Sequence, residues 1–205
     1  KKLIYSIYRV DYNIYIPSGE SNIGILSKFD IDSKIVSLGS NIRFKINYKN
    51  RDIIIYGIHL KNKKDGAIET EKNRLRELDI ILQDTSRFKN EQIIILGDFS
   101  DNYGSKPLKK MNNSEFINLL FTKKYTGSFY DKYTYWDDKN NNNILDVGEV
   151  IDLDHIFVNY NLFKNVSRIF IDHVMPQSVK GVDETLEVYK RKRLSDHWAL
   201  IAIIQ

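Results

Sequence analysis

Residues 93–100 read Ile-Ile-Ile-Leu-Gly-Asp-Phe-Ser, and this stretch decides the fold. Four consecutive apolar residues without alternation are typical of a strand that is covered on both faces. Gly97 then permits a tight bend, which directs Asp98 into whatever cleft lies at the strand end. A turn-forming aspartate would satisfy the same pattern, so this stretch alone does not establish a function.

Further apolar runs lie on both sides of this stretch and predict strands at residues 23–26, 42–46, 53–58, 156–158 and 200–204. A helix is predicted after residue 65, with Asp65 as N-cap and Ile68, Leu75, Leu78 and Leu82 at helical spacing. A shorter helix is predicted over residues 114–121. Strands interleaved with helices indicate a layered α/β domain.

Length and composition exclude several classes of protein. The chain has 205 residues with a net charge of +4 and 42% hydrophobic residues, which suits one ordered domain. Cysteine is absent, which excludes disulfides, thiolate-bound zinc and a thiol nucleophile. The longest apolar run, residues 199–204, is far shorter than the roughly 18 residues of a membrane span. We expect a monomer, and the compartment is left open with a lean toward secretion.

Acidic and imidazole residues follow the predicted strands. They occur in the segments 58–61 (Ile-His-Leu-Lys), 96–99 (Leu-Gly-Asp-Phe), 152–156 (Asp-Leu-Asp-His-Ile) and 194–197 (Leu-Ser-Asp-His). In layered α/β folds, side chains at strand ends converge from distant parts of the chain. A lone histidine is more often structural, but three of the four histidines lie in such segments. Histidines and carboxylates together suit acid/base chemistry around a hard divalent cation.

The set of motifs resembles the endonuclease/exonuclease/phosphatase superfamily, the deoxyribonuclease I-like fold. The matching segments are 24–28, 58–61, 95–100, 154–158 and 195–197, and the helix that carries Arg74 and Glu77 also fits. The resemblance spans most of the chain from about Gly19 and is nearest to bacterial and secreted nuclease-type members. It implies a four-layer α/β/β/α sandwich over residues 1–205 and hydrolysis of phosphate esters with Mg²⁺ or Mn²⁺.

The resemblance also implies roles for individual residues. His197 resembles the strand-end histidine that activates water or contacts metal and phosphate, and Asp154 its carboxylate partner. His59 resembles the second histidine, which contacts the phosphate and protonates the leaving oxygen. Asp98 resembles the carboxylate that orients or deprotonates water, and with Asp196 it is predicted to bind the metal. Glu20 is aligned loosely with a glutamate that supports the second histidine.

Two departures from the family pattern stand out. The Asn and Glu that hold the family's principal metal have no counterpart in residues 1–18, and the chain begins with Lys1 rather than Met. We therefore expect the chain to lack its N-terminal strands. Many members also carry Asn two residues after the aspartate, where this chain has Ser100. Ser100 and Asn102 are expected to contact the substrate phosphate, with a shorter reach from serine.

Residues 138–149 match a calcium loop. The predicted ligands, at positions 1, 3, 5, 7, 9 and 12, are Asp138, Asn140, Asn142, Ile144, Asp146 and Glu149. Asn143 replaces the usual glycine at position 6 and tolerates the left-handed conformation. A solvated Asn-rich loop with accidental spacing is the alternative. We expect a structural Ca²⁺ that stabilises the start of the Asp154 strand.

Basic and aromatic residues bear on the substrate. The run 190–193 (Lys-Arg-Lys-Arg) directly precedes 195–197, so Arg193 is predicted to contact substrate phosphate. An aromatic-rich stretch, with Tyr125, Tyr130, Tyr133, Tyr135 and Trp136, suits core packing as well as base stacking. The leading interpretation is a nuclease of low sequence specificity with a nucleic-acid substrate. The alternatives are a phosphatase or phospholipase acting on an inositol phosphate or sphingomyelin-like head group, and a non-catalytic calcium-binding relative.

Overall fold

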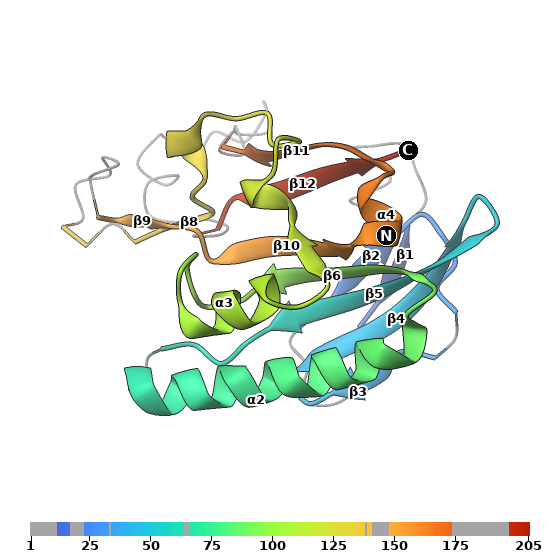
Figure 1. The fold of residues 1–205 in the computed structure, drawn as a ribbon, viewed down its shortest axis with the longest axis horizontal. Coiled ribbons are helices and arrows are strands. Elements are labelled where there is room, and N and C mark those ends of the chain that lie inside the picture. The colour runs from blue at the N-terminus through green and yellow to red at the C-terminus, as the bar shows by residue number, and fades with distance from the viewer. Residues whose placement is uncertain are drawn as a thin grey trace, which may run out of the picture.

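The computed structural model describes residues 12–16, 23–32, 34–63, 66–137, 139–140, 148–173 and 197–205. Its main sheet has six strands in the order β3-β4-β5-β6-β10-β7 (Figure 1). These strands are β3 (Val36–Leu38), β4 (Asn41–Tyr48), β5 (Arg51–His59), β6 (Gln92–Asp98), β7 (Phe116–Asn118) and β10 (Asp154–Asn159). β5 and β6 are parallel, and the other neighbouring pairs are antiparallel.

Three two-stranded sheets accompany the main sheet. They pair β1 (Asn13–Tyr15) with β2 (Ile25–Ser27), β8 (Tyr135–Trp136) with β9 (Val150–Ile151), and β11 (Val166–Asp172) with β12 (Ala199–Ile204). The helices are α2 (Ala67–Thr85), α3 (Lys106–Asn112) and α4 (Tyr160–Phe163), with short 3-10 turns η1 (Ser86–Phe88), η2 (Leu119–Phe121) and η3 (Phe129–Asp131). Among the described residues, no helix has both the length and the apolar character needed to cross a bilayer.

The unbroken isoleucine runs are explained by burial on both faces of the sheet. One face of β5 and β6 packs Ile54, Tyr56, Ile93 and Ile95 against α2 and α3. The opposite face packs against β11 and β12, and its core comprises Ile53, Ile94, Leu119, Ile156, Val158, Leu162, Val166 and Ile169. A third cluster around Ile42 and Phe44 lies beneath β1 and β2. Helices, main sheet and second sheet are therefore three successive layers of the predicted sandwich (Figure 1).

Local sequence explains the tight β4–β5 hairpin and the start of α3. Lys49 and Asn50 both have positive φ, 52° and 60°, and form the two-residue turn between β4 and β5. Asparagine tolerates this conformation, which matches the twist of the flanking strands. Ser105 caps α3 by accepting a hydrogen bond from the Leu108 N–H, and Pro107 lies in the first turn. These features position the loop that follows β6.

The helix predictions need two corrections. α2 begins at Ala67 after Gly66, and the predicted cap Asp65 lies outside the described residues. Its buried face is formed by Arg74, Leu78 and Ile81, while Ile68 is 76% exposed. The helix predicted at 114–121 is wrong, since this segment forms β7 and η2. Residues 116–118 pair with β10 as the edge strand of the main sheet. This pairing favours a strand, although the spacing of the apolar residues suggested a helix.

Candidate active site

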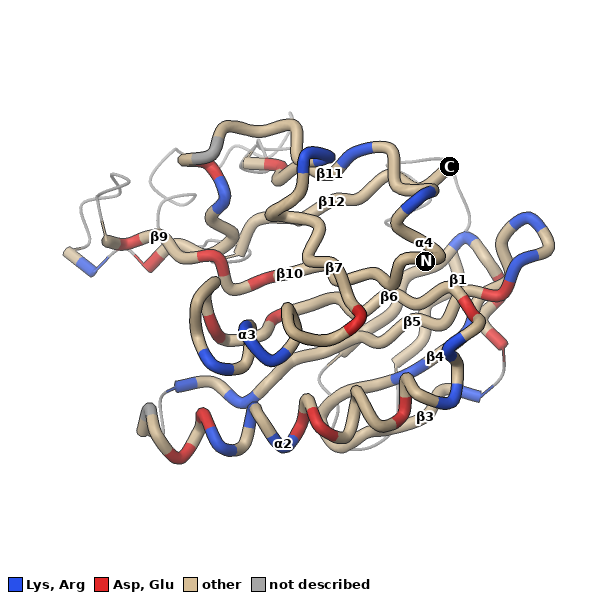
Figure 2. The backbone as a smooth tube through the Cα atoms, in the orientation of Figure 1, with Lys and Arg blue, Asp and Glu red and all other residues tan. Residues whose placement is uncertain are grey.

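Three strand ends of the main sheet bring the predicted catalytic residues together. His59 is paired with Asp98 across the parallel β5–β6 ladder, and Asp154 is paired with Asp98 across β6–β10. Asp98 therefore lies between an imidazole and a second carboxylate. Figure 2 shows acidic residues at this end of the sheet, where β10 begins. The order of strands thus gathers residues that are 39 and 56 positions apart in the chain.

His197 is paired with Asp154. Its Nδ1 lies 2.6 Å from Asp154 Oδ2, and both side chains are mostly buried, with 27% and 19% exposed. The short separation fits an Nδ1–H that donates to the carboxylate. This hydrogen bond fixes the tautomer of the imidazole, so proton transfer with a substrate would fall to Nε2. The arrangement matches the pairing that the resemblance implies.

Thr134 connects the Asp154 strand to the His197 segment. Its buried hydroxyl oxygen accepts the backbone N–H groups of Leu153 at 3.0 Å and Asp154 at 2.8 Å. Its carbonyl oxygen accepts the N–H of Trp198 at 2.7 Å. One residue therefore sets the spacing between the two members of the pair. No sequence signal pointed to this role, because Thr134 lies in an aromatic stretch interpreted as packing.

Burial raises the pKa of the Asp98 carboxyl, and the neighbouring Asp154 raises it further. The Ser100 N–H opposes this shift by donating to Asp98 Oδ1 at 2.6 Å, and the charges of His197 and His59 oppose it too. His59 Nε2 is 3.7 Å from Asp98 Oδ2, beyond a direct hydrogen bond. A carboxylate whose proton affinity is raised is better suited to accept a proton from water.

Side chains hold the His59 segment where β5 leaves the sheet. Every backbone N–H and C=O of residues 59–61 has a hydrogen-bond partner from another element. The N–H groups donate to Asn41 Oδ1 at 2.9 Å, Asp98 O at 2.9 Å and Glu77 Oε2 at 3.1 Å. The carbonyl groups accept from Ser40 Oγ at 3.4 Å, Ser100 Oγ at 3.0 Å and Arg74 Nη1 at 2.9 Å. The backbone that carries His59 is thus fixed by residues from three other segments, 40–41, 74–77 and 98–100.

This network changes the interpretation of Ser100. The residue is buried at 5% exposure and adopts a positive φ of 50°. Its hydroxyl donates to the Leu60 carbonyl, and its amide donates to Asp98. The expected phosphate contact from the Ser100 hydroxyl would require breaking the Leu60 hydrogen bond, so the geometry gives Ser100 a positioning role instead. Asn102 is exposed, and a phosphate contact from it remains a prediction.

A buried ion pair supports the loop after Asp98. Arg74 and Asp101 are 2% and 3% exposed, with Arg74 Nε 2.8 Å from Asp101 Oδ2. Lys63 Nζ lies 2.7 Å from the other carboxylate oxygen. The Asp101 carbonyl oxygen lies 3.2 Å from His155 Nε2. Since Asn118 Nδ2 donates to His155 Nδ1 at 3.2 Å, Nε2 carries the hydrogen.

His155 is therefore a structural residue. It is fully buried, and burial lowers its pKa, so the neutral imidazole is favoured. Its ring meets the rings of Phe99 and Phe157 at 5.4 and 6.2 Å between centroids. His173 bonds the Tyr133 carbonyl through Nε2 and lies against the Tyr133 ring. Of the four histidines, His59 and His197 are the two that lie next to the site carboxylates.

We expect Arg74→Met to lower the free energy of unfolding by about 3 kcal/mol, because it leaves the buried Asp101 with a single, half-exposed partner. Urea denaturation monitored by circular dichroism would measure the change. Lys63→Met is the matched control and should cost less than about 1 kcal/mol, since Lys63 is 47% exposed. An Arg74→Met loss no larger than the control's would contradict the structural role of this pair.

Several predicted site residues lie outside the described residues. They are Glu20, Asp138, Asn142, Ile144, Asp146, Arg193 and Asp196. Among the residues that are described, no group of three or more His, Asp and Glu side chains is arranged to hold a metal ion. Asp98 and Asp154 supply the carboxylate oxygens that Mg²⁺ and Mn²⁺ prefer, and a cation would offset their mutual repulsion. The donor chemistry fits a divalent cation that takes its remaining ligands from elsewhere.

The segment predicted to bind calcium, residues 138–149, lies in the sequence between β8 and β9, which pair with each other. Of its predicted ligands, Asn140 is exposed and Glu149 is 5% exposed. The Glu149 carboxylate accepts from Trp136 Nε1 at 3.2 Å and from the Lys139 N–H at 3.1 Å. Its backbone carbonyl accepts the Asp137 N–H at 2.8 Å. Glu149 therefore closes the base of the loop.

Comparisons with known proteins place this geometry in a known fold. No family model matches the sequence, and no curated protein matches it. An endonuclease/exonuclease/phosphatase family protein from Leptotrichia buccalis aligns over 100% of this chain and 75% of its own, with a TM-score of 0.63 and 17% identity. TDP2 from C. elegans aligns over 97% of this chain and 59% of its own, with a TM-score of 0.61 and 14% identity.

A mutant beta toxin from Staphylococcus aureus with bound magnesium ions aligns over 89% of this chain and 67% of its own, with a TM-score of 0.58 and 20% identity. At such identities the likeness establishes the fold. The chain has the fold of the endonuclease/exonuclease/phosphatase superfamily, so the predicted fold class is confirmed. Chemistry and substrate must be argued from the site itself.

Proposed function

We propose that this protein hydrolyses phosphodiester bonds in nucleic acid with the help of Mg²⁺ or Mn²⁺. The observation that carries the proposal is the convergence of His59, Asp98 and the Asp154–His197 pair at the ends of neighbouring strands of the main sheet. Two imidazoles flanking two carboxylates supply a proton acceptor and a proton donor, as displacement at phosphorus requires. A bound divalent cation would neutralise charge on the phosphoryl oxygens.

The proposed step uses the residues as follows. Asp98 orients a water molecule and accepts its proton as the water oxygen bonds to phosphorus. The bond from phosphorus to the leaving oxygen breaks, and that oxygen takes a proton from His59. His197, held by Asp154, contacts the phosphate from the β10 side of Asp98, whereas His59 lies on the β5 side. Asp196, which lies in the same chain segment, is proposed as a ligand of the cation.

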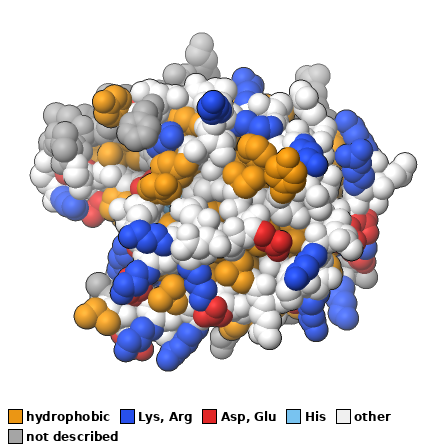
Figure 3. All heavy atoms as spheres, viewed as in Figure 1, with side chains coloured by type: hydrophobic (Ala, Val, Ile, Leu, Met, Phe, Trp, Pro, Cys, Tyr) orange, Lys and Arg blue, Asp and Glu red, His pale blue; other side chains and the backbone are white. Residues whose placement is uncertain are grey.

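Nucleic acid is preferred as substrate because of the basic run 190–193 next to His197. On the face shown in Figure 3, lysine and arginine side chains are spread out and do not gather in one patch. Electrostatics on that face therefore does not select the substrate. The choice rests on the sequence beside the site and on the nuclease-like His-Leu-Lys segment.

The direct test is the relaxation of supercoiled plasmid DNA by the full-length protein, with Mg²⁺ or Mn²⁺ and with EDTA as a control. We expect nicking that depends on the added metal. Hydrolysis of sphingomyelin or an inositol phosphate without any nicking would instead support a phospholipase or phosphatase. Inactivity toward all three substrates would support a non-catalytic relative.

We further propose a structural Ca²⁺ in the 138–149 loop, supported by the ligand spacing and by Glu149 at the base of the hairpin. Calcium at about 100 times its dissociation constant should raise the melting temperature by about 5–10 °C. Differential scanning calorimetry with and without calcium would measure the shift. Glu149→Gln should abolish it, and Asp137→Asn, adjacent to the loop, should retain it. Equal shifts in parent and Glu149→Gln would refute the site.

A further inference from the structure

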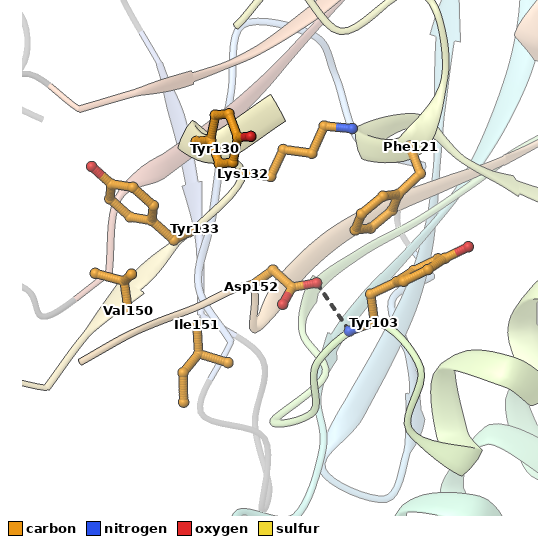
Figure 4. A pocket seen from close by; sticks show the side chains of 8 residues that line it. All are labelled: Tyr103, Phe121, Tyr130, Lys132, Tyr133, Val150, Ile151 and Asp152. Carbon is orange, nitrogen blue, oxygen red and sulfur yellow. Dashed lines mark hydrogen bonds between the residues drawn. The ribbon is translucent and has the colours of Figure 1, made fainter. Parts of the chain in front are cut away.

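A hollow of about 230 Å³ lies among segments that also carry candidate site residues (Figure 4). Two segments that carry site residues also supply its walls, and a third wall residue contacts the neighbour of His197. Tyr103 follows Ser100 by three residues, and Asp152 precedes Asp154 by two. The Tyr133 ring packs 5.1 Å from the ring of Trp198, the neighbour of His197. A substrate whose phosphate lies at the site would therefore have its adjoining group near this hollow.

Aromatic rings form the walls of the hollow. Tyr103 stacks on Phe121 with 4.0 Å between ring centroids and an interplanar angle of 29°. Tyr133 also lines the hollow, and its ring packs against the rings of His173 and Trp198. Tyr103 is 52% exposed, and an exposed aromatic ring offers a π face on which a base can stack, as in single-stranded nucleic acid. The volume is below the roughly 300–1,000 Å³ of pockets for drug-sized ligands, so it suits one base rather than a long chain.

Asp152 supplies a hydrogen-bond acceptor at the floor of the hollow. Its Oδ2 accepts the backbone N–H of Tyr103 at 2.9 Å, and its carboxylate points between the aromatic walls (Figure 4). An ionised carboxylate has about four lone-pair sites and no donor. It can therefore accept a hydrogen bond from an exocyclic amino group, as in carboxylate recognition of cytosine N4. Thymine presents a carbonyl oxygen at the same position, which a carboxylate repels.

Lys132 argues against a cationic ligand. Its Nζ lies 4.8 Å from the Phe121 ring centroid and 5.3 Å from that of Tyr125. A quaternary ammonium group, such as that of a choline lipid, binds through cation–π contacts with aromatic faces. Here an ammonium group already occupies the Phe121 face, and it would repel a second cation.

We propose that this hollow is a base-binding subsite that selects an amino-bearing base, cytosine over thymine, beside the scissile phosphate. The inference rests on the proposed function, since it names part of that substrate. The ring of Tyr103, which is 52% exposed, provides affinity by stacking, and Asp152 provides selectivity.

Binding of mononucleotides tests the subsite without any need for catalysis. Isothermal titration with dCMP, dTMP and phosphocholine should show dCMP binding about tenfold more tightly than dTMP. Tyr103→Ala should weaken dCMP binding about tenfold, while Tyr103→Phe, which keeps the ring, should bind like the parent. Asp152→Asn should reduce the preference for dCMP to within about twofold, because an amide also donates to thymine. Tighter binding of phosphocholine than of dCMP, or equal binding of dCMP and dTMP by the parent, would overturn the proposal.

Cleavage distinguishes failure of the subsite from failure of the proposed function. The parent should cut an oligo(dC) faster than an oligo(dT), and Tyr103→Ala should slow oligo(dC) without affecting an abasic oligonucleotide. Equal effects of Tyr103→Ala on both substrates would refute the subsite but would leave the proposed nuclease activity supported. Absence of cleavage of every oligonucleotide would refute the nuclease, and the nucleotide titrations would still decide whether the hollow binds a base.

Discussion

His197→Ala is expected to lower the rate of plasmid nicking by about 100- to 1,000-fold, the usual cost of removing one group that stabilises charge on the reacting centre. The imidazole is held at 2.6 Å by Asp154 and lies beside the carboxylate of Asp98. Its loss removes a group that contacts the phosphate and leaves Asp154 without its partner. Initial rates of conversion of supercoiled to open-circular DNA would measure the effect.

Matched aspartate variants show whether this loss is specific to the site. Asp154→Asn keeps the shape of the side chain but removes the charge that holds His197, so activity should fall. Asp79→Asn removes a 63%-exposed carboxylate on α2 that pairs with Lys110, and it should nick like the parent. His197→Ala protein with unchanged melting temperature and undiminished nicking would refute the proposed chemistry.

Gly97→Ala is expected to prevent folding or to lower the free energy of unfolding by more than about 4 kcal/mol. Gly97 has a φ of +134°, and a Cβ there would lie 2.1 Å from the carbonyl oxygen of Ile58. That oxygen belongs to the neighbouring strand of the main sheet, so the clash cannot be relieved by a side-chain rotation. Urea denaturation, or the yield of soluble protein, would show the effect.

Gly104→Ala is the matched control. Gly104 also has a positive φ, +97°, but a Cβ there would meet no atom within 4 Å. Its substitution should cost only backbone strain, about 1–3 kcal/mol. Comparable losses in the two variants would show that the close approach of β5 and β6 at Gly97 adds little to the cost of the positive φ.

Apolar runs made the strands predictable, because burial on both faces leaves little choice of residue. The run 93–96 lies within β6 and 53–58 within β5. The segment 116–118 was not predictable as a strand, since its pairing partner Phe157 is distant in the chain. The buried face of α2 was predicted only in part: Leu78 is buried as expected, but charged Arg74 is also buried, where it pairs with Asp101.

The catalytic candidates could be predicted as residue types that follow strands, but their supporting contacts could not. The His59 segment is held by side-chain hydrogen bonds from Asn41, Ser40 and Glu77 to its backbone. Such bonds produce no periodic pattern in a sequence. The same holds for Thr134, because nothing in the sequence distinguishes it from other threonines near strands. Ser100 differs visibly from the family pattern, yet only its bond to Leu60 shows what it does.

The turn at Lys49–Asn50 has a practical consequence. β5 runs from Arg51 beside that turn to His59 at the candidate site, a length of about 26 Å at 3.3 Å per residue. The turn is the end of the hairpin and lies at the opposite end of β5 from the reacting groups. A fluorophore or a surface tether attached there would label or immobilise the protein without blocking the substrate from the candidate site.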